Sequence, residues 1–233
     1  MIYDWPTKLL APRISNLRLI NRTRSAGASL TGFEQVSDPI TQRWAFTIDF
    51  PNLRKDAILP FRALVASLKG RSNVVRVPIF DQFLWAPDDA IGIANVPDRL
   101  DPWADYDDGE KISDVSATVT VAQGVNALTV DLSNIDEPSK VILAGQYFGI
   151  GDDLHVIGLN GVSFSGNVAT VTFEPSTRRA RTRAPFKLRP TLLCRLANDE
   201  SGAHPMQYGR ITAPTLDMVE VLADELASDE VAL

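Results

Sequence analysis

Hydrophobic and polar side chains alternate strictly along residues 43–50. Period-2 alternation of aromatic and β-branched residues predicts a half-buried strand. The residues expected on its buried face are Trp44, Phe46, Ile48 and Phe50.

A helix is predicted over residues 56–69, because its apolar residues recur at i, i+3, i+4 and i+7 and form one stripe. Asp56 is the expected N-cap, and Gly70 suits the position after the helix. Residues 74–80 then return as a strand. A helix with one apolar face between two strands is expected to cover a sheet. The stripe consists of Phe61, Leu64, Val65 and Leu68.

The remaining ends of the chain are expected to belong to the same lobe. Residues 1–13 form an apolar arm around Trp5 that packs on the domain or on a neighbouring subunit, and residues 15–22 form a strand. The Ser/Gly/Thr-rich stretch 23–38 indicates a hairpin loop. Three strands and one helix make a thin sheet with an open edge. We therefore expect the strand-like runs 188–196 and 207–220 to complete it, which gives a first lobe of residues 1–80 and 187–221.

Residues 115–186 predict a second, inserted lobe. Short, evenly spaced strands bounded by turn residues indicate a small β-barrel or sandwich, with a hairpin turn at Gly151. The fold class is therefore mainly β: a β-sandwich lobe with one docked α-helix, plus an inserted small β-barrel or sandwich domain. Residues 222–233 form an acidic tail. The expected strands of the insert are 116–121, 127–132, 146–150, 154–158 and 167–173.

Composition excludes several classes of protein. The chain has 233 residues, 45% hydrophobic and 22% charged, with a net charge of −6. Nucleic-acid and anionic-membrane binders need a basic footprint, so neither is expected. Cys194 is the single cysteine, which rules out an internal disulfide and a thiolate cluster. With no apolar run of membrane-spanning length and no signal-peptide pattern, we expect synthesis in the cytoplasm and no membrane partner.

Two charged segments are candidates for assembly contacts. The acidic, proline-containing segment 81–114 includes the acidic stretch 98–110, with Asp105, Asp107 and Asp108, whose spacing matches a calcium loop poorly. The arginine segment 176–183 is either a solvated loop or a partner for carboxylate or phosphate. We favour pairing of its arginines with the acidic stretch across a subunit boundary. These arginines are Arg178, Arg179, Arg181 and Arg183.

Catalytic motifs are not found in the sequence. There is no Gly-x-Ser-x-Gly elbow, phosphate loop or His-Glu-x-x-His, and His155 and Cys194 suit structural positions. We expect no enzyme activity, cofactor or metal. The remaining enzymatic alternative is a hydrolase that uses Asp/Glu pairs, such as Asp105 and Asp107.

Two passages resemble a known family. One runs from Trp44 to Pro78, with Phe50-Pro-Asn-Leu, a helix that ends Leu68-Lys-Gly-Arg71, and Val75-Arg-Val-Pro78. The other is Ala144–Ile157, followed by Phe173-Glu-Pro and Pro185-Phe-Lys-Leu-Arg. Together they resemble distal tail proteins, which are tail-tip components of long-tailed (siphovirus-like) bacteriophages. The acidic segment 81–114 departs from that pattern.

The resemblance implies a structural protein of the virion tail with no active site. Such proteins form a ring, generally a homohexamer, that joins the tail tube protein to the hub or other tail-tip proteins. Trp5, the three aspartates and the four arginines named above are our candidate subunit contacts. The alternative is a carbohydrate- or receptor-binding β module of a tail tip. Its groove would need exposed aromatic side chains, for which the candidates are Tyr147, Phe148 and Phe164.

Overall fold

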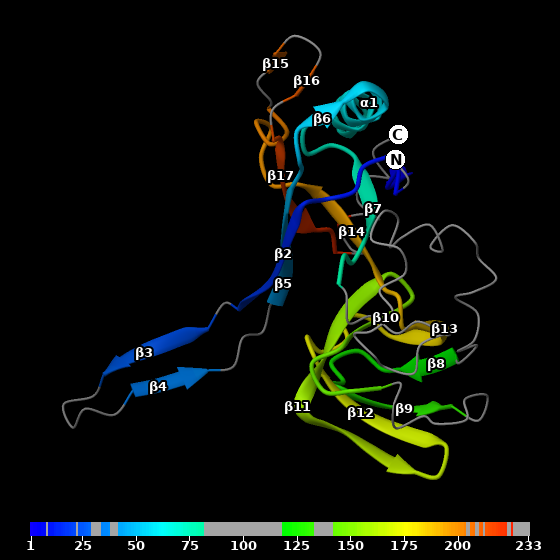
Figure 1. Cartoon of the computed structure of the whole chain (residues 1–233). Helices are drawn as coiled ribbons and strands as arrows, with labels where there is room; N and C mark the ends of the chain where they lie inside the picture. The colour runs from blue at the N-terminus through cyan, green and yellow to red at the C-terminus, as the bar shows by residue number, and fades with distance from the viewer. Residues whose placement is uncertain are drawn as a thin grey trace.

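The computed structural model describes residues 1–81, 118–132 and 142–225, except residues 8, 22, 29–33, 38–41, 204–205, 208–209, 212 and 223–224. The described part is mainly β, with two six-stranded sheets (Figure 1). The acidic segment from residue 82 to 114, which includes Asp105, Asp107 and Asp108, lies outside it.

The first sheet combines early and late strands of the chain. Its central strands come from the end of the described sequence, which confirms that the late strands complete the sheet. All neighbours are antiparallel except β1 and β7, which run parallel. In spatial order the strands are β1 (Ile2–Asp4), β7 (Val74–Pro78), β14 (Thr191–Leu196), β17 (Thr215–Glu220), β5 (Gln42–Asp49) and β2 (Ile14–Asn21).

The predicted alternation on β5 is confirmed, since all four residues of its apolar face are at most 2% exposed. Helix α1 (Ile58–Leu68) lies against the same core through Phe61, Leu64 and Leu68, and Val65 is half-buried. The aromatic ring of Phe61 meets Phe50 edge to face at 5.4 Å.

The start of the helix differs from the prediction. Asp56 is not the N-cap, because it lies inside a 3₁₀ turn, η1 (Lys55–Ala57), that precedes α1. Ala57 occupies the cap position and supplies no side-chain hydrogen bond. At the other end Lys69 and Gly70 both have left-handed backbone angles, with φ of 47° and 63°, so glycine follows the cap as predicted.

The second sheet is curled nearly into a barrel, because its two edge strands β8 and β9 also contact each other. Its core centres on Phe148, whose ring lies 5.4 Å from Phe173 and 5.1 Å from Phe186. In spatial order the strands are β8 (Thr118–Val121), β13 (Arg181–Lys187), β10 (Tyr147–Ile150), β11 (Asp153–Ser165), β12 (Val168–Glu174) and β9 (Ala127–Asp131).

Strand β11 is much longer than the predicted run 154–158. Its register against β12 shifts between Ile157 and Val162, so the intervening Gly-Leu-Asn-Gly forms a bulge and not the end of the strand. At Gly161 a Cβ atom would lie 2.5 Å from the carbonyl oxygen of Thr172, so only glycine fits there. The predicted turn at Gly151, where φ is 66°, is confirmed.

Two small sheets flank the first lobe. The hairpin of β3 (Arg24–Ala28) and β4 (Glu34–Ser37) confirms the expectation for residues 23–38 and extends away from the body (Figure 1). Near α1, β6 (Leu53–Arg54) pairs with β16 (Arg210–Ile211), which pairs with β15 (Met206–Gln207).

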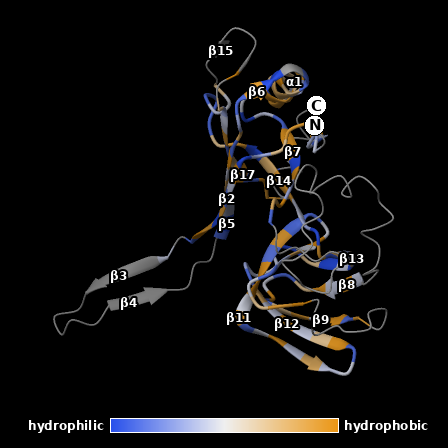
Figure 2. Cartoon of the chain, viewed as in Figure 1, coloured by the Kyte–Doolittle hydropathy of each residue, from blue (hydrophilic) through white to orange (hydrophobic). Residues whose placement is uncertain are grey.

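The two lobes share part of their core. Hydrophobic residues concentrate on strands of both sheets, such as β7 and β9 (Figure 2). Leu154 of β11 is fully buried in the hydrophobic cluster of the first lobe. At the same boundary the Trp44 indole N–H donates to the Leu154 carbonyl oxygen at 2.9 Å and the ring meets Tyr147 edge to face. The second lobe is therefore fixed to the first by packing as well as by the chain.

Candidate assembly site

Trp5, the candidate contact in the N-terminal arm, lies in the core of its own chain. It is 6% exposed, stacks on Phe50 at 5.9 Å and meets Phe80 at 6.0 Å. Its indole N–H donates to the Leu10 carbonyl oxygen at 3.1 Å. Of the two expectations for the arm, Trp5 shows packing on its own domain, because the apolar surface of its indole is covered within the same chain. A subunit contact at Trp5 stays a prediction.

Arg178 also has its partners within the chain, and they lie in the other lobe. Its guanidinium donates to both carboxylate oxygens of Glu220 on β17, at 2.8 Å for Nη2–Oε2, and to the Gln42 carbonyl oxygen at 2.8 Å. The backbone N–H of Trp44 donates to the same carboxylate at 2.9 Å. This buried group links the arginine segment to the centre of the first sheet.

Glu220 is the member of this group that the sequence analysis missed. It is 3% exposed, and burial raises the pKa of its carboxyl, against the hydrogen bond and charge of Arg178. A signal was present in the sequence. Leu216, Met218 and Glu220 alternate on the buried face of β17, and a carboxylate on an apolar face calls for a cation.

Two further arginines of the segment pair with one carboxylate of the second lobe. Arg181 Nη2 lies 2.6 Å and Nε 3.0 Å from Asp153 Oδ2, and Arg179 Nε lies 3.8 Å from the same oxygen. Arg181 therefore has an acidic partner within its own chain, and Arg179 shares that single carboxylate at a longer distance. A contact of either residue with another subunit stays a prediction.

Arg183 differs from its neighbours. Its side chain is exposed, and none of the described residues forms an ion pair with it. Its backbone N–H donates to Thr120 Oγ1 at 3.1 Å, and its φ is 50°. Among the four arginines, Arg183 is the one with no acidic partner within the described residues, and its subunit contact stays a prediction.

The first sheet ends in an open strand on each side. Among the described residues, β2 pairs with β5 alone, and β1 pairs with β7 alone. The β2 edge is eight residues long, and its Ile14 and Ile20 are 52% and 37% exposed. An open strand with apolar side chains is a template for pairing with another chain.

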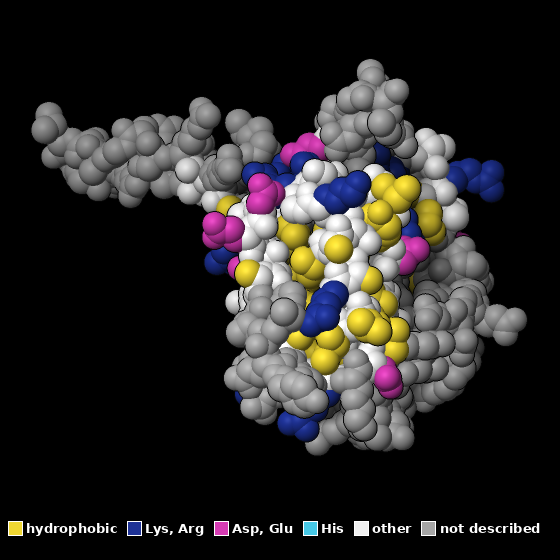
Figure 3. Space-filling view, turned by 90° about the horizontal axis from the view of Figure 1, so that it is seen from above, with side chains coloured by type: hydrophobic (Ala, Val, Ile, Leu, Met, Phe, Trp, Pro, Cys, Tyr) yellow, Lys and Arg dark blue, Asp and Glu magenta, His cyan; other side chains and the backbone are white. Residues whose placement is uncertain are grey.

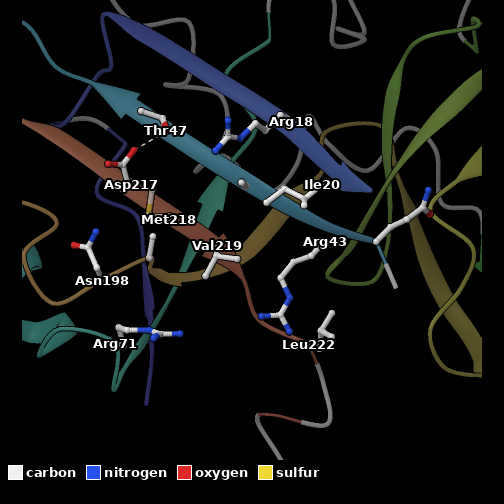
Figure 4. A pocket seen from close by; sticks show the side chains of 13 residues that line it. Arg18, Ile20, Arg43, Thr47, Arg71, Asn198, Asp217, Met218, Val219 and Leu222 are labelled. Carbon is white, nitrogen blue, oxygen red and sulfur yellow. Dashed lines mark hydrogen bonds between the residues drawn. The ribbon is translucent and has the colours of Figure 1, made fainter. Parts of the chain in front are cut away.

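A groove of about 740 Å³ lies on the outer surface of the same sheet (Figure 4). Figure 4 shows Arg18, Arg43 and Arg71 around it, from β2, β5 and the loop after α1. Asp217 lies at one side, where its carboxylate accepts a hydrogen bond from Thr47 at 2.7 Å. Apolar residues of the lining include Ile20, Ala45, Val219 and Leu222.

The aromatic residues of the binding-module alternative are mostly used in packing. Phe148 is fully buried in the barrel, and Tyr147 is half-buried against Trp44. Phe164 is 38% exposed. The three side chains therefore do not form one exposed aromatic row.

His155 makes the stability of the fold depend on pH. It is 2% exposed between Phe148 and Phe173, with Nδ1 donating to the Pro175 carbonyl oxygen at 2.8 Å, and burial lowers its pKa to about 4. Between pH 6.5 and about 4 the unfolded chain therefore binds a proton on His155 that the folded chain does not bind. Neutral His155 therefore contributes its full stabilisation above pH 6.5. As the pH falls to about 4, this contribution to the free energy of unfolding drops by about 3 kcal/mol.

Urea unfolding of the native chain and of His155→Gln at pH values from 4 to 7.5 checks this. The loss of unfolding free energy towards acid should be smaller in the variant by that amount. Glu220, whose pKa is raised, acts in the opposite direction and is common to both proteins. An equal loss of unfolding free energy towards low pH in both proteins would contradict the role of His155.

Other candidate chemistry is limited in the described part of the chain. Cys194 is fully buried, which raises the pKa of its thiol and confirms it as a small core residue. Among the described residues, no three His, Cys, Asp or Glu side chains cluster as a metal site would need. No helix within those residues has the length and apolarity to cross a membrane.

No model of a protein family matches the sequence, and no curated protein matches it significantly.

Proposed function

We propose that the protein is a structural component of a phage tail tip, of the distal-tail type, whose copies form a closed ring that joins the tail tube to the hub. The observation that carries the proposal is the first sheet with its two different open edges, β1 and β2. Rings are built from head-to-tail contacts between unlike surfaces. Two unlike sheet edges on one lobe provide such a pair.

Two further features support a ring. The β3–β4 hairpin directly follows the β2 edge and extends away from the body (Figure 1), which suits contact with a neighbouring copy. At the end of the molecule that carries α1, hydrophobic side chains gather on the surface (Figure 3). Exposed apolar residues of the arm and helix are Met1, Ile2, Leu9 and Leu59. An apolar end suits axial contact with the tube or the hub.

The binding-module alternative has weaker support, because Phe148 and Tyr147 are committed to packing. In the proposed ring the second lobe would stay attached to the first through the packing of Leu154 and the Arg178–Glu220 pair.

Light scattering of the purified protein tests the proposal. A discrete closed oligomer near six subunits over a range of concentrations supports the ring. A monomer at all concentrations, also in the presence of the tail tube protein, would overturn it, and a glycan-binding screen would then test the alternative.

Lysine on the β2 edge should break the ring without unfolding the subunit. Ile14→Lys combined with Ile20→Lys places charge on an open strand, and charged side chains on edge strands oppose pairing. We expect the oligomer to dissociate to monomers, with a circular dichroism spectrum unchanged. Leu159→Lys is the matched control, since Leu159 is 89% exposed on the second lobe. An intact ring in the double variant would show that β2 is not an interface.

A further inference from the structure

The charges of this chain are unevenly distributed along it. Residues 1–81 hold 12 Lys and Arg against six Asp and Glu, whereas residues 82–117 hold two against nine. The net charge of −6 therefore conceals a cationic first lobe. Glu220 pairs with Arg178, and Asp153 pairs with Arg181, so an acidic partner has more unpaired cations available elsewhere on the first lobe.

The groove on the outer surface of the first sheet provides cations of the right kind. Arg18 and Arg71 both line it and are exposed. No carboxylate of the described residues pairs with either guanidinium. Guanidinium groups on opposite sides of an apolar floor suit an extended peptide whose acidic and apolar side chains alternate.

One arginine of the groove already pairs with a carboxylate of the same chain. Glu225 lies between Arg43, which lines the groove, and Arg195, with a distance of 2.5 Å from Arg43 Nη2. Partial burial opposes ionisation, yet the two arginines lower the pKa of Glu225 below its usual value. A glutamate of this chain is thus recognised by paired arginines at this surface.

We propose that the groove binds the acidic stretch 98–110 of a second copy of the chain. The inference rests on the proposed function, since the ring supplies the second copy. The stretch combines six carboxylates with the apolar side chains of Leu100 and Trp103. The carboxylates would pair with Arg18 and Arg71, and the apolar side chains would cover Ile20 and Val219. This replaces the arginine segment as the partner of the acidic stretch.

Disulfide trapping between two full-length variants tests the identity of the partner. Arg71→Cys is mixed with Asp107→Cys under mild oxidation; Cys194 is buried in both. A linked dimer in the mixture, absent from either variant alone, is the expected result. The control replaces Arg71→Cys with Arg54→Cys, because Arg54 is exposed on the same lobe but does not line the groove. A variant that carries both Arg71→Cys and Asp107→Cys completes the test. If its disulfide forms only within one chain, the proposal is overturned.

Peptide binding tests the chemistry independently of the ring. A fluorescent peptide of residues 98–110 is titrated with the native protein, with Arg18→Glu plus Arg71→Glu, and with Arg13→Glu plus Arg54→Glu as the charge-matched control. We expect about tenfold weaker binding for the groove variant alone, the effect of losing two partly exposed ion pairs. Equal binding by both variants, or tighter binding of a 20-base-pair DNA duplex than of the peptide, would overturn the proposal.

The mass of the native protein in solution, measured beside these two tests, separates this inference from the proposed function. One outcome is a closed native ring in which Arg71→Cys forms no disulfide with Asp107→Cys and the peptide binds equally well without Arg18 and Arg71. This outcome would overturn the inference and leave the proposed ring standing. Linkage and peptide binding in a protein that forms no closed ring would support the groove and overturn the ring.

Discussion

Arg178→Met is expected to lower the free energy of unfolding by about 3–5 kcal/mol, the usual cost of leaving one member of a buried ion pair without its partner. Glu220 would keep only the Trp44 backbone N–H as a donor, and burial already raises the pKa of its carboxyl. Urea unfolding at pH 7.5 measures the loss. Arg183→Met is the control, because Arg183 is an exposed arginine of the same segment, and its loss should lie within about 0.5 kcal/mol of zero.

The double variant Arg178→Met and Glu220→Met identifies the cause. Replacing both members of a buried pair with apolar side chains is often close to neutral, so the double variant should be more stable than Arg178→Met alone. The single variant Glu220→Met completes the cycle. If the losses of unfolding free energy in the two single variants simply add in the double variant, Arg178 acts through packing of its stem and not through the charge of Glu220.

Trp5→Ala is expected to cost about 3–5 kcal/mol as well, the range for removing a large buried aromatic side chain. The variant would open the space beside Phe50 and Phe80 and release the Leu10 carbonyl oxygen from its donor. Thermal or urea unfolding of the monomer measures the loss. Leu9→Ala is the matched control in the same arm, since Leu9 is 48% exposed.

The result would also decide the role of the arm. A core role predicts that the monomer itself loses stability, whereas a subunit contact predicts an unchanged monomer and a weakened oligomer. Unchanged unfolding of the Trp5→Ala monomer would contradict the packing described here.

Local patterns in the sequence were sufficient for most strands and for the helix. The alternation at residues 43–50 and the stripe of α1 each depend on neighbours within one element, so period alone assigns them. The bulge in β11 could not be assigned in this way. Its Gly-Leu-Asn-Gly has turn composition, and only the close approach of Thr172 shows that the strand continues.

Period and spacing do not identify contact partners that lie far apart in the sequence. Apolarity predicts that Trp5 is buried but not against which surface. The charges of the arginine segment predict carboxylate partners but not that Glu220 and Asp153 are those partners. Such pairings depend on the tertiary arrangement, which one sequence does not specify by spacing.

The strand order of the first sheet has a consequence for how the protein is made. β17 lies between β14 and β5, yet it is the last of the six strands to leave the ribosome. Until then, β2 with β5 and β1 with β7 and β14 form two separate groups, whose inner edges at β5 and β14 remain open. Sheets that close through distant segments fold slowly and expose aggregation-prone edges meanwhile. A nascent chain stalled before residue 215 would therefore need a chaperone, because it lacks the strand that joins the two halves.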